Sequence, residues 1–255
     1  MTEQQIVALA ERFWRTAGQV EPFPRSLETA VPWALPLAIV KLPRLGMVEL
    51  RCWLARRGIT VSCRLPNRGL RGALLARAGR GFVFLDGSDP DEERRFSLAH
   101  EVAHFVKDHL HPREQALAAF GESIREVLDG LRPPAPEERL TAVFRGLELG
   151  VYAHWMERTA EGTIGRARIL EAEDDADRLA LELLAPAGVV NARLTALSEP
   201  PGSAAVTRLL ITEFGLPSTP ARSYGAWLFA RRQASRSFRE WLGLAGCRSS
   251  GRAPE

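Results

Sequence analysis

The stretch DPDEERRFSLAHEVAHF, residues 89–105, decides the fold of the region around it. We expect Asp89 to be the N-cap residue of a helix, Pro90 to occupy its first position and Glu92 to complete a capping box. The acidic residues at this end also favour the positive end of the helix dipole. Apolar side chains then recur at helical spacing, and they are Phe96, Ala99, Val102, Ala103 and Val106. The sequence therefore predicts a well-defined amphipathic helix.

Within this helix, His100 and His104 are four residues apart and therefore share one face. Two imidazole nitrogens on one face can bind a single Zn²⁺ ion. Glu101 projects beside them, where its carboxylate could take a proton from an activated water and pass it to a leaving amine. Two histidines on a helix also fit ordinary surface or core positions, so further ligands have to be identified.

A catalytic zinc ion needs a third protein ligand and an open position for water. His109 and His111 are close in sequence, but they lie near the end of the same helix, where we expect solvated side chains. His154 is another candidate, and together with Tyr152 it could line the cleft and stabilise a transition state. Ordinary packing is the competing interpretation of that pair.

Glu173 is the remaining candidate for the third ligand. Glu173 and Asp177 are four residues apart in a predicted helix, so both project from one face. Glu173 could bind zinc while Asp177 accepts a hydrogen bond from the far ring nitrogen of a ligating histidine. The acidic run continues into the apolar residues 179–184, so one side of this helix must be buried. Acidic residues at the boundary of a buried helix face suggest a functional role more strongly than acidic residues on a solvent-exposed helix.

Residues 95–105 and the pattern ExxADxLAxxLLAP, residues 173–186, form two motifs in a fixed order. Both closely resemble the motifs of the ImmA/IrrE family of bacterial metallopeptidase-like regulators. The resemblance covers roughly residues 46–195, and two ordered motifs are far more specific than the HExxH pattern alone.

The resemblance implies one zinc ion per chain, bound by His100, His104 and Glu173. Glu101 corresponds to the catalytic acid and base. The family's fold is a small zincin-like domain, which is often followed by a helix-turn-helix segment. Its best-known members cleave a DNA-binding repressor and thereby release genes for stress response or mobile-element transfer.

Stretches rich in β-forming residues precede the motif helix. Residues 59–63 lie between turn residues, and residues 73–76 and 82–85 are separated by a Gly-Arg-Gly turn at 79–81. We therefore expect an α+β fold with a small antiparallel sheet. Further helices are predicted at residues 6–16, 46–57, 116–128, 137–147, 170–184, 204–214 and 220–230.

The proline-rich linker SEPPGS begins at residue 198 and suggests a domain boundary there. We expect a metallopeptidase domain over residues 1–197 and a helix-turn-helix-like helical domain over 198–246, with a disordered tail at 247–255. The distance between the two motifs is long for the family. We interpret residues 112–169 as an inserted helical segment that could cover the cleft.

Positive charge gathers in the last part of the chain. From residue 201 onward there are eight arginines against three acidic residues, although the net charge of the whole chain is only +3. Arg222, Arg231 and Arg232 are candidate contacts to nucleic-acid phosphates. A solvated arginine-rich face, or a surface for a protein partner, is an equally acceptable interpretation.

The composition, with 45% hydrophobic and 25% charged residues, is that of a globular protein. The sequence contains no apolar run long enough to span a bilayer and no secretory signal, so we expect a cytoplasmic protein without a membrane partner. Its three cysteines have no metal-binding spacing and are expected to be reduced.

The leading hypothesis is a zinc endopeptidase that makes limited cuts in a regulatory protein substrate, a DNA-binding repressor. The alternative is a transcriptional regulator or partner-binding module that keeps the zincin-like fold without proteolysis. A purely structural zinc site is a third reading, but it has no need of the free carboxylate that Glu101 offers.

Overall fold

A computed structural model describes most of the chain, and the described residues divide into two compact units, Met1–Pro186 and Ala187–Glu255. The described ranges are 1–18, 22–59, 69–139, 152–157, 167–197 and 202–241. The division after Pro186 precedes the boundary predicted at residue 198, because the helix at 187–195 groups with the helices that follow it. None of the helices in these ranges combines the length and apolar character needed to cross a bilayer.

The first unit contains a mixed four-stranded sheet with the strand order β1-β3-β2-β4. Its central hairpin joins β2 (Leu70–Arg77) to β3 (Arg80–Asp86) in antiparallel pairing. The turn consists of Ala78 and Gly79, whose φ angles of 53° and 75° are those of a tight two-residue hairpin. The α+β class expected from the sequence is confirmed.

Neither edge strand was predicted from the sequence, and one of them departs from the expected antiparallel pairing. Strand β1 (Leu37–Leu42) pairs in parallel with β3, and β4 (Tyr152–Glu157) pairs antiparallel with β2. Strand β1 was not predicted because the prolines on either side of it were interpreted as loop residues. Prolines are, however, tolerated at the ends of an edge strand. Strand β4 lies inside the segment 112–169, so that segment is not the purely helical insertion that we predicted.

Two other predicted elements fall largely outside the described residues. Of the predicted strand at 59–63, residues 60–63 are not described, and the predicted helix at 137–147 is described only as far as residue 139. The predicted helix at 116–128 is replaced by α5 (His111–Phe120), a 3₁₀ turn η2 (Glu122–Ile124) and α6 (Arg125–Leu128).

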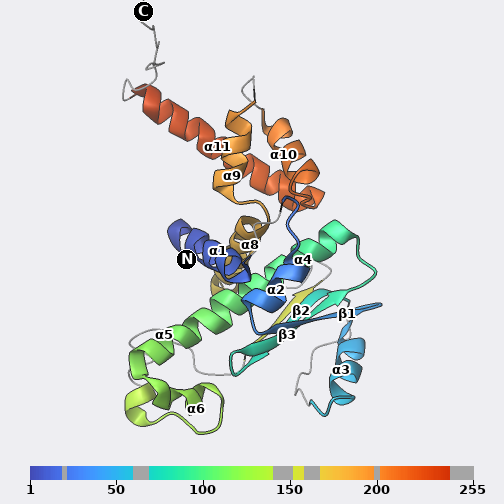
Figure 1. The fold of residues 1–255 in the computed structure, drawn as a ribbon, viewed down its shortest axis with the longest axis vertical. Coiled ribbons are helices and arrows are strands. Elements are labelled where there is room, and N and C mark those ends of the chain that lie inside the picture. The colour runs from blue at the N-terminus through green and yellow to red at the C-terminus, as the bar shows by residue number, and fades with distance from the viewer. Residues whose placement is uncertain (19–21, 60–68, 140–151, 158–166, 198–201, 242–255) are drawn as a thin grey trace, which may run out of the picture. The chain divides into compact units, whose positions relative to one another are not determined.

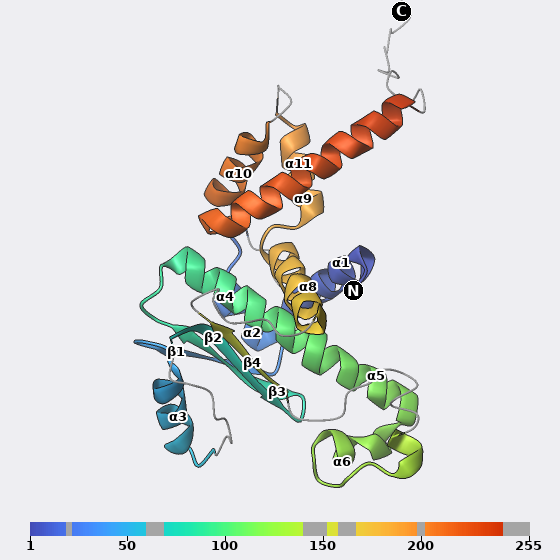
Figure 2. The same cartoon turned by 180° about the vertical axis from the view of Figure 1, so that it is seen from behind.

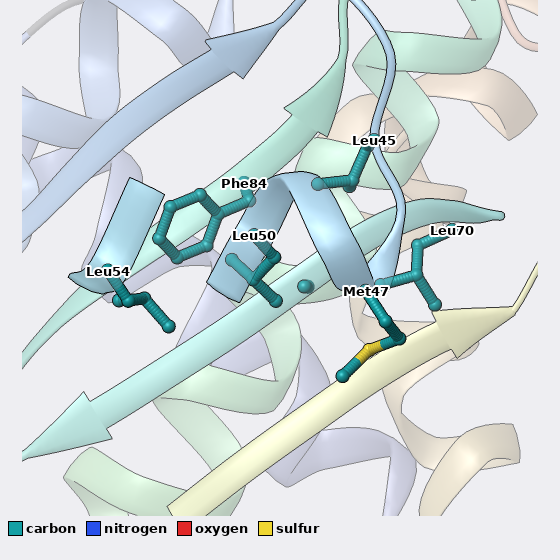
Figure 3. Close-up of a cluster of buried hydrophobic side chains, with 7 residues drawn as sticks. Leu45, Met47, Leu50, Leu54, Leu70 and Phe84 are labelled. Atoms are coloured by element: carbon teal, nitrogen blue, oxygen red, sulfur yellow. The ribbon is translucent and has the colours of Figure 1, made fainter. Parts of the chain in front are cut away.

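One face of the sheet is covered by helix α3 (Met47–Ala55). A buried cluster joins this helix to β2 and β3 (Figure 3), and its members are Leu45, Met47, Leu50, Leu54, Leu70, Ala73 and Phe84. The pairing of β2 with β4 shifts register between Leu70 and Gly72. Because of this irregularity, Leu70 and Ala73 both contribute to the cluster under α3. Gly72 lies on the opposite face of the sheet, toward Glu101 of the helix that covers that face.

The opposite face of the sheet is covered by helix α4 (Asp91–His104), which packs on β2 and β3 (Figures 1 and 2). Helix α8 (Ala167–Leu184) packs across α4, and α1 (Glu3–Ala17) packs on α8. The indole of Trp14 donates a hydrogen bond of 3.0 Å to the carbonyl of Leu183, which fixes α1 on α8. Helix α2 (Leu27–Ala34) lies beside α1 and α4. The two motif helices of the sequence are therefore direct neighbours.

Helix α4 starts one residue later than predicted. Pro90, with ψ of 152°, is its N-cap residue, and no side chain caps the helix, so the predicted roles of Asp89, Pro90 and Glu92 are wrong. The extended ψ of Pro90 keeps it outside the helix. The carbonyl of Asp89 accepts a hydrogen bond of 2.8 Å from the guanidinium of Arg94 instead.

The far end of α4 also differs from the expectation, because the helix does not end near residue 111. It continues through a π-helical turn, η1 (Phe105–Leu110), into α5, which ends at Gly121. Pro112 lies in the first turn of α5 and lacks the amide that a regular helix would need there. A π-helical turn is a known way to accommodate such an interruption.

The second unit contains α9 (Ala187–Thr195), α10 (Ser203–Thr212) and α11 (Ser218–Trp241). Helices α10 and α11 pack closely, since a Cβ atom at Gly225 would lie 2.8 Å from the hydroxyl of Thr207. Helix α11 is twice as long as the short helix predicted at 220–230. The helix-turn-helix assignment stays a prediction.

Candidate metal centre

Two helices bring three metal-ligand side chains together in the first unit. The Nε2 atoms of His100 and His104, on α4, are 3.1 Å apart. Glu173, on α8, places its Oε2 atom 3.3 Å from Nε2 of His100 and its Oε1 atom 3.7 Å from Nε2 of His104. Among the described side chains, these three form the group whose donor atoms all lie within 4.8 Å of one another.

The spacing of these donors fits a small tetrahedral ion. Two donors that each lie about 2.1 Å from a tetrahedrally coordinated ion are about 3.4 Å apart. The Nε2 atoms of the two histidines are 3.1 Å apart, and each lies 3.3 or 3.7 Å from one of the two oxygens of Glu173, so the separations are close to this value. Two imidazoles and one carboxylate are also a donor set that Zn²⁺ accepts, and three protein ligands leave a fourth position open. The residues present therefore suit the metal predicted from the sequence.

The side of His100 that faces away from the donors is held by α8. Its Nδ1 atom donates to Oδ1 of Asp177 over 2.8 Å, the contact that we predicted. This hydrogen bond fixes the ring tautomer and leaves the lone pair of Nε2 directed at the ligand position. His100 is only 3% exposed, whereas the Asp177 side chain is 52% exposed.

His104 has an equivalent partner that sequence reasoning missed. Its Nδ1 atom donates to Oδ2 of Asp108 over 2.7 Å, and the ammonium of Lys107 donates to the other oxygen, Oδ1, over 2.5 Å. Burial raises the pKa of Asp108, but the hydrogen bond from His104 and the charge of Lys107 outweigh burial and hold this pKa below its ordinary value. The available signal was the four-residue spacing of His104 and Asp108 within the predicted helix.

The electrostatics of the centre favour a positive charge. Burial alone lowers the pKa of His100, but hydrogen bonds to Asp177 and Glu173 and the charge of Glu101 raise it to about 9. A site that holds a proton so firmly in the protein without metal has an excess of negative charge. A divalent cation bound between the same groups would neutralise that negative charge.

Glu101 is fully buried at the interface between α4 and the sheet. A Cβ atom at Gly72, on β2, would lie 2.7 Å from Oε1 of Glu101 and 3.0 Å from its Cγ atom. The absence of a side chain at Gly72 therefore makes the space that the glutamate occupies. Sequence reasoning did not single out Gly72, because a glycine inside a strand does not reveal what approaches it.

The remaining histidines are placed differently from one another. His109 is buried, and its Nε2 atom accepts a hydrogen bond of 3.0 Å from the amide of Gly79 in the β2–β3 turn. Burial and the nearby Arg113 lower the pKa of His109, so the prediction that it is a solvated helix-terminal residue is wrong. His111 contacts Gln115, one turn along α5, and does not join the centre.

Tyr152 and His154 lie on β4, which is next to β2 and close to α4. Their side chains are outside the described part of the structure, so their suggested role in stabilising a transition state stays a prediction.

The three predicted arginine contacts all lie on α11 in the second unit. Arg222 is exposed, and the guanidinium of Arg231 lies 5.2 Å from the centre of the Trp227 ring. Arg232 donates to the carbonyl of Asn191 over 3.3 Å, so this arginine is used to join α11 to α9.

Comparison with known proteins supports the interpretation of the first unit. Residues 54–129 match the Peptidase_M78 family, described as the IrrE N-terminal-like domain. The matched range contains Gly72, Asp108 and the whole of α4, and it ends before Glu173 and Asp177 on α8. No curated protein matches the chain.

Proposed function

We propose that this chain, whose residues 54–129 match the IrrE N-terminal-like domain, is a zinc-dependent endopeptidase that makes limited cuts in a regulatory protein. The observation that carries this proposal is the convergence of His100 and His104 from α4 with Glu173 from α8. The buried carboxylate of Glu101 follows His100 on the same helix, next to these donors.

Each of these side chains has a distinct task in peptide hydrolysis. His100, His104 and Glu173 would hold one zinc ion, which supplies a Lewis acid for the peptide carbonyl and for the attacking water. Glu101 would accept a proton from that water on its carboxylate and deliver it to the leaving amine nitrogen. Gly72 keeps the backbone of β2 close to Glu101 and so restricts where that carboxylate can lie.

We propose that the substrate is a DNA-binding transcriptional repressor and that its cleavage serves stress response or mobile-element control in the cytoplasm. This part of the proposal depends on the resemblance of the two motifs to a family with such members. The direct test is to incubate the zinc-loaded chain with the repressor encoded nearest to its gene and to look for one discrete fragment.

The assigned role of Glu101 can be tested with Glu101→Gln, which preserves the size of the side chain but removes its basicity. We expect this variant to bind zinc as the parent chain does and to lose cleavage by about 100-fold or more. The matched control is Glu11→Gln, a change at an exposed position of α1, which should leave cleavage unchanged. Cleavage at the parental rate by Glu101→Gln would rule out the role.

A second candidate function, binding of an anionic partner such as duplex DNA, is favoured by one feature of α11. Tyr224 stacks on the half-exposed Trp227 with ring centres 5.7 Å apart. The guanidinium of Arg231 also lies over the Trp227 ring, 5.2 Å from its centre. Duplex binding that weakens steeply with salt and with Arg222→Ala would support this function. Binding that is absent, or insensitive to salt, would count against it.

A further inference from the structure

We propose that Asp108 and Lys107 adjust the strength with which His104 holds the metal, Asp108 increasing it and Lys107 limiting it. This inference depends on the proposed metal site, and it concerns a part of the centre that neither motif contains. Asp108 acts on the metal through His104, so it is a positioning residue rather than a catalytic one.

The two histidines are supported unequally. His100 is held by Asp177 from a different helix, and that carboxylate is half-exposed to solvent. His104 is held by Asp108 from the next turn of its own helix, and this carboxylate is largely buried. Asp108 also accepts a hydrogen bond from an ammonium group, since Lys107 donates to its Oδ1 atom.

The hydrogen bond from His104 to Asp108 has two consequences for a metal ion. It keeps the proton on Nδ1, so that the lone pair of Nε2 points at the other donors. A negatively charged acceptor also increases the electron density of the ring and makes His104 a stronger ligand. A neutral amide in place of Asp108 would preserve part of the first effect and lose the second.

Lys107 opposes the second effect. Its ammonium takes a share of the Asp108 charge, and it adds a positive charge to the surroundings of the His104 support. The Lys107 side chain is only 7% exposed, so water screens this repulsion weakly. A lysine is almost never this buried unless its charge is paired, and here it is paired with Asp108.

The local backbone makes this arrangement possible. Lys107 and Asp108 belong to the π-helical turn η1, which directly follows His104. Such turns widen a helix by one residue, and they occur often at functional sites. In this turn the Asp108 carboxylate points back to His104, and the Lys107 side chain is nearly buried.

The experiment measures zinc affinity of the full chain by competition with a chromophoric chelator, and it needs no substrate. We expect Asp108→Asn to weaken zinc binding by about 10- to 100-fold. Lys107→Met, which keeps the buried apolar volume, should tighten zinc binding severalfold. The double variant should fall between the two single variants, and it avoids leaving the lysine charge buried without its partner.

Two matched controls separate this effect from general damage. Asp91→Asn, at the exposed start of α4, and Lys41→Met, at an exposed position of β1, should both leave zinc affinity unchanged. The visible absorption of the Co²⁺-loaded chain provides a second measurement, and we expect its bands to shift in Asp108→Asn. A thermal melt of each variant establishes that it is folded.

Opposite changes in Asp108→Asn and Lys107→Met support the inference, because loss of folding cannot tighten binding. Weaker binding in both variants, or no change in either, would overturn it. If the parent chain itself binds no zinc, the proposed peptidase function fails at the same time. If the parent chain binds zinc and both variants match it, only the present inference fails.

Discussion

The two helices that build the candidate centre differ in how firmly they hold its side chains. On α4, His104 and Glu101 are 1% and 0% exposed; His104 donates to Asp108 in the turn that follows, and Glu101 lies against Gly72 of β2. On α8, the side chains of Glu173 and Asp177 are 33% and 52% exposed. The matched family range contains the α4 part and stops before the α8 part. We infer from this difference that α4 provides the more buried half of the candidate site and that α8 completes it.

The largest effect should come from breaking the α4 half. We expect His104→Ala to abolish stoichiometric zinc binding, because it removes a donor and leaves Asp108 and Lys107 buried without it. Glu173→Gln should weaken binding less, since its amide oxygen remains near the partly exposed position. Calorimetric titration with zinc measures both variants. Equal losses in the two variants would contradict the distinction between the helices.

The next effect should come from filling the space that β2 leaves for Glu101. The added methyl group of Gly72→Ala would displace the carboxylate, and we expect cleavage to fall by about 100-fold while zinc affinity stays within about threefold. The control is Gly188→Ala on α9, where a Cβ atom meets nothing within 4 Å. A cleavage rate in Gly72→Ala equal to that of the control would show that the strand does not position Glu101.

A smaller effect concerns pH. Because the folded-state pKa of His100 is raised to about 9, its proton stabilises the metal-free fold fully below about pH 6.5, and this contribution is lost as pH rises through about 9. We expect the metal-free chain to lose up to about 3 kcal/mol over that range. Zinc replaces the proton, so the zinc-loaded chain should not follow this trend. Denaturation with and without a chelator at several pH values tests the prediction.

The smallest effect should come from the exposed support on α8. Asp177→Asn should weaken zinc binding by about tenfold, the lower end of the range for such a partner, because solvent already screens this carboxylate. Asp174→Asn, one residue after Glu173 and exposed, is the matched control. If Asp177→Asn weakened zinc binding more than Asp108→Asn, Asp177 rather than Asp108 would be the stronger support of its histidine.

The parts of the site that the sequence predicted are those whose spacing is local. His100 and His104, and likewise Glu173 and Asp177, are four residues apart, so helical periodicity alone places each pair on one face. The approach of the two pairs was implied by a family resemblance, and the structure brings them together. Their functional roles still await experiment.

The parts that the sequence did not predict depend on contacts between distant segments. The role of Gly72 depends on Glu101, which is distant in the sequence and lies against it. Likewise, β1 and β4 are defined as strands by their pairing with β3 and β2. Asp108 follows His104 by four residues inside the same predicted helix, so its spacing could have identified it. It was missed because it lies outside both motifs that the resemblance covers.

The zinc site between α4 and α8 is tested most directly by X-ray absorption at the zinc edge, recorded on the full chain loaded with one equivalent of zinc. We predict a shell of two imidazole nitrogens and carboxylate or water oxygens at about 2.0–2.2 Å, four ligands in all. In His104→Ala this shell should lose one imidazole or disappear with the metal. A shell that contains sulfur, or one that is the same in the parent chain and in His104→Ala, would contradict a zinc site between α4 and α8.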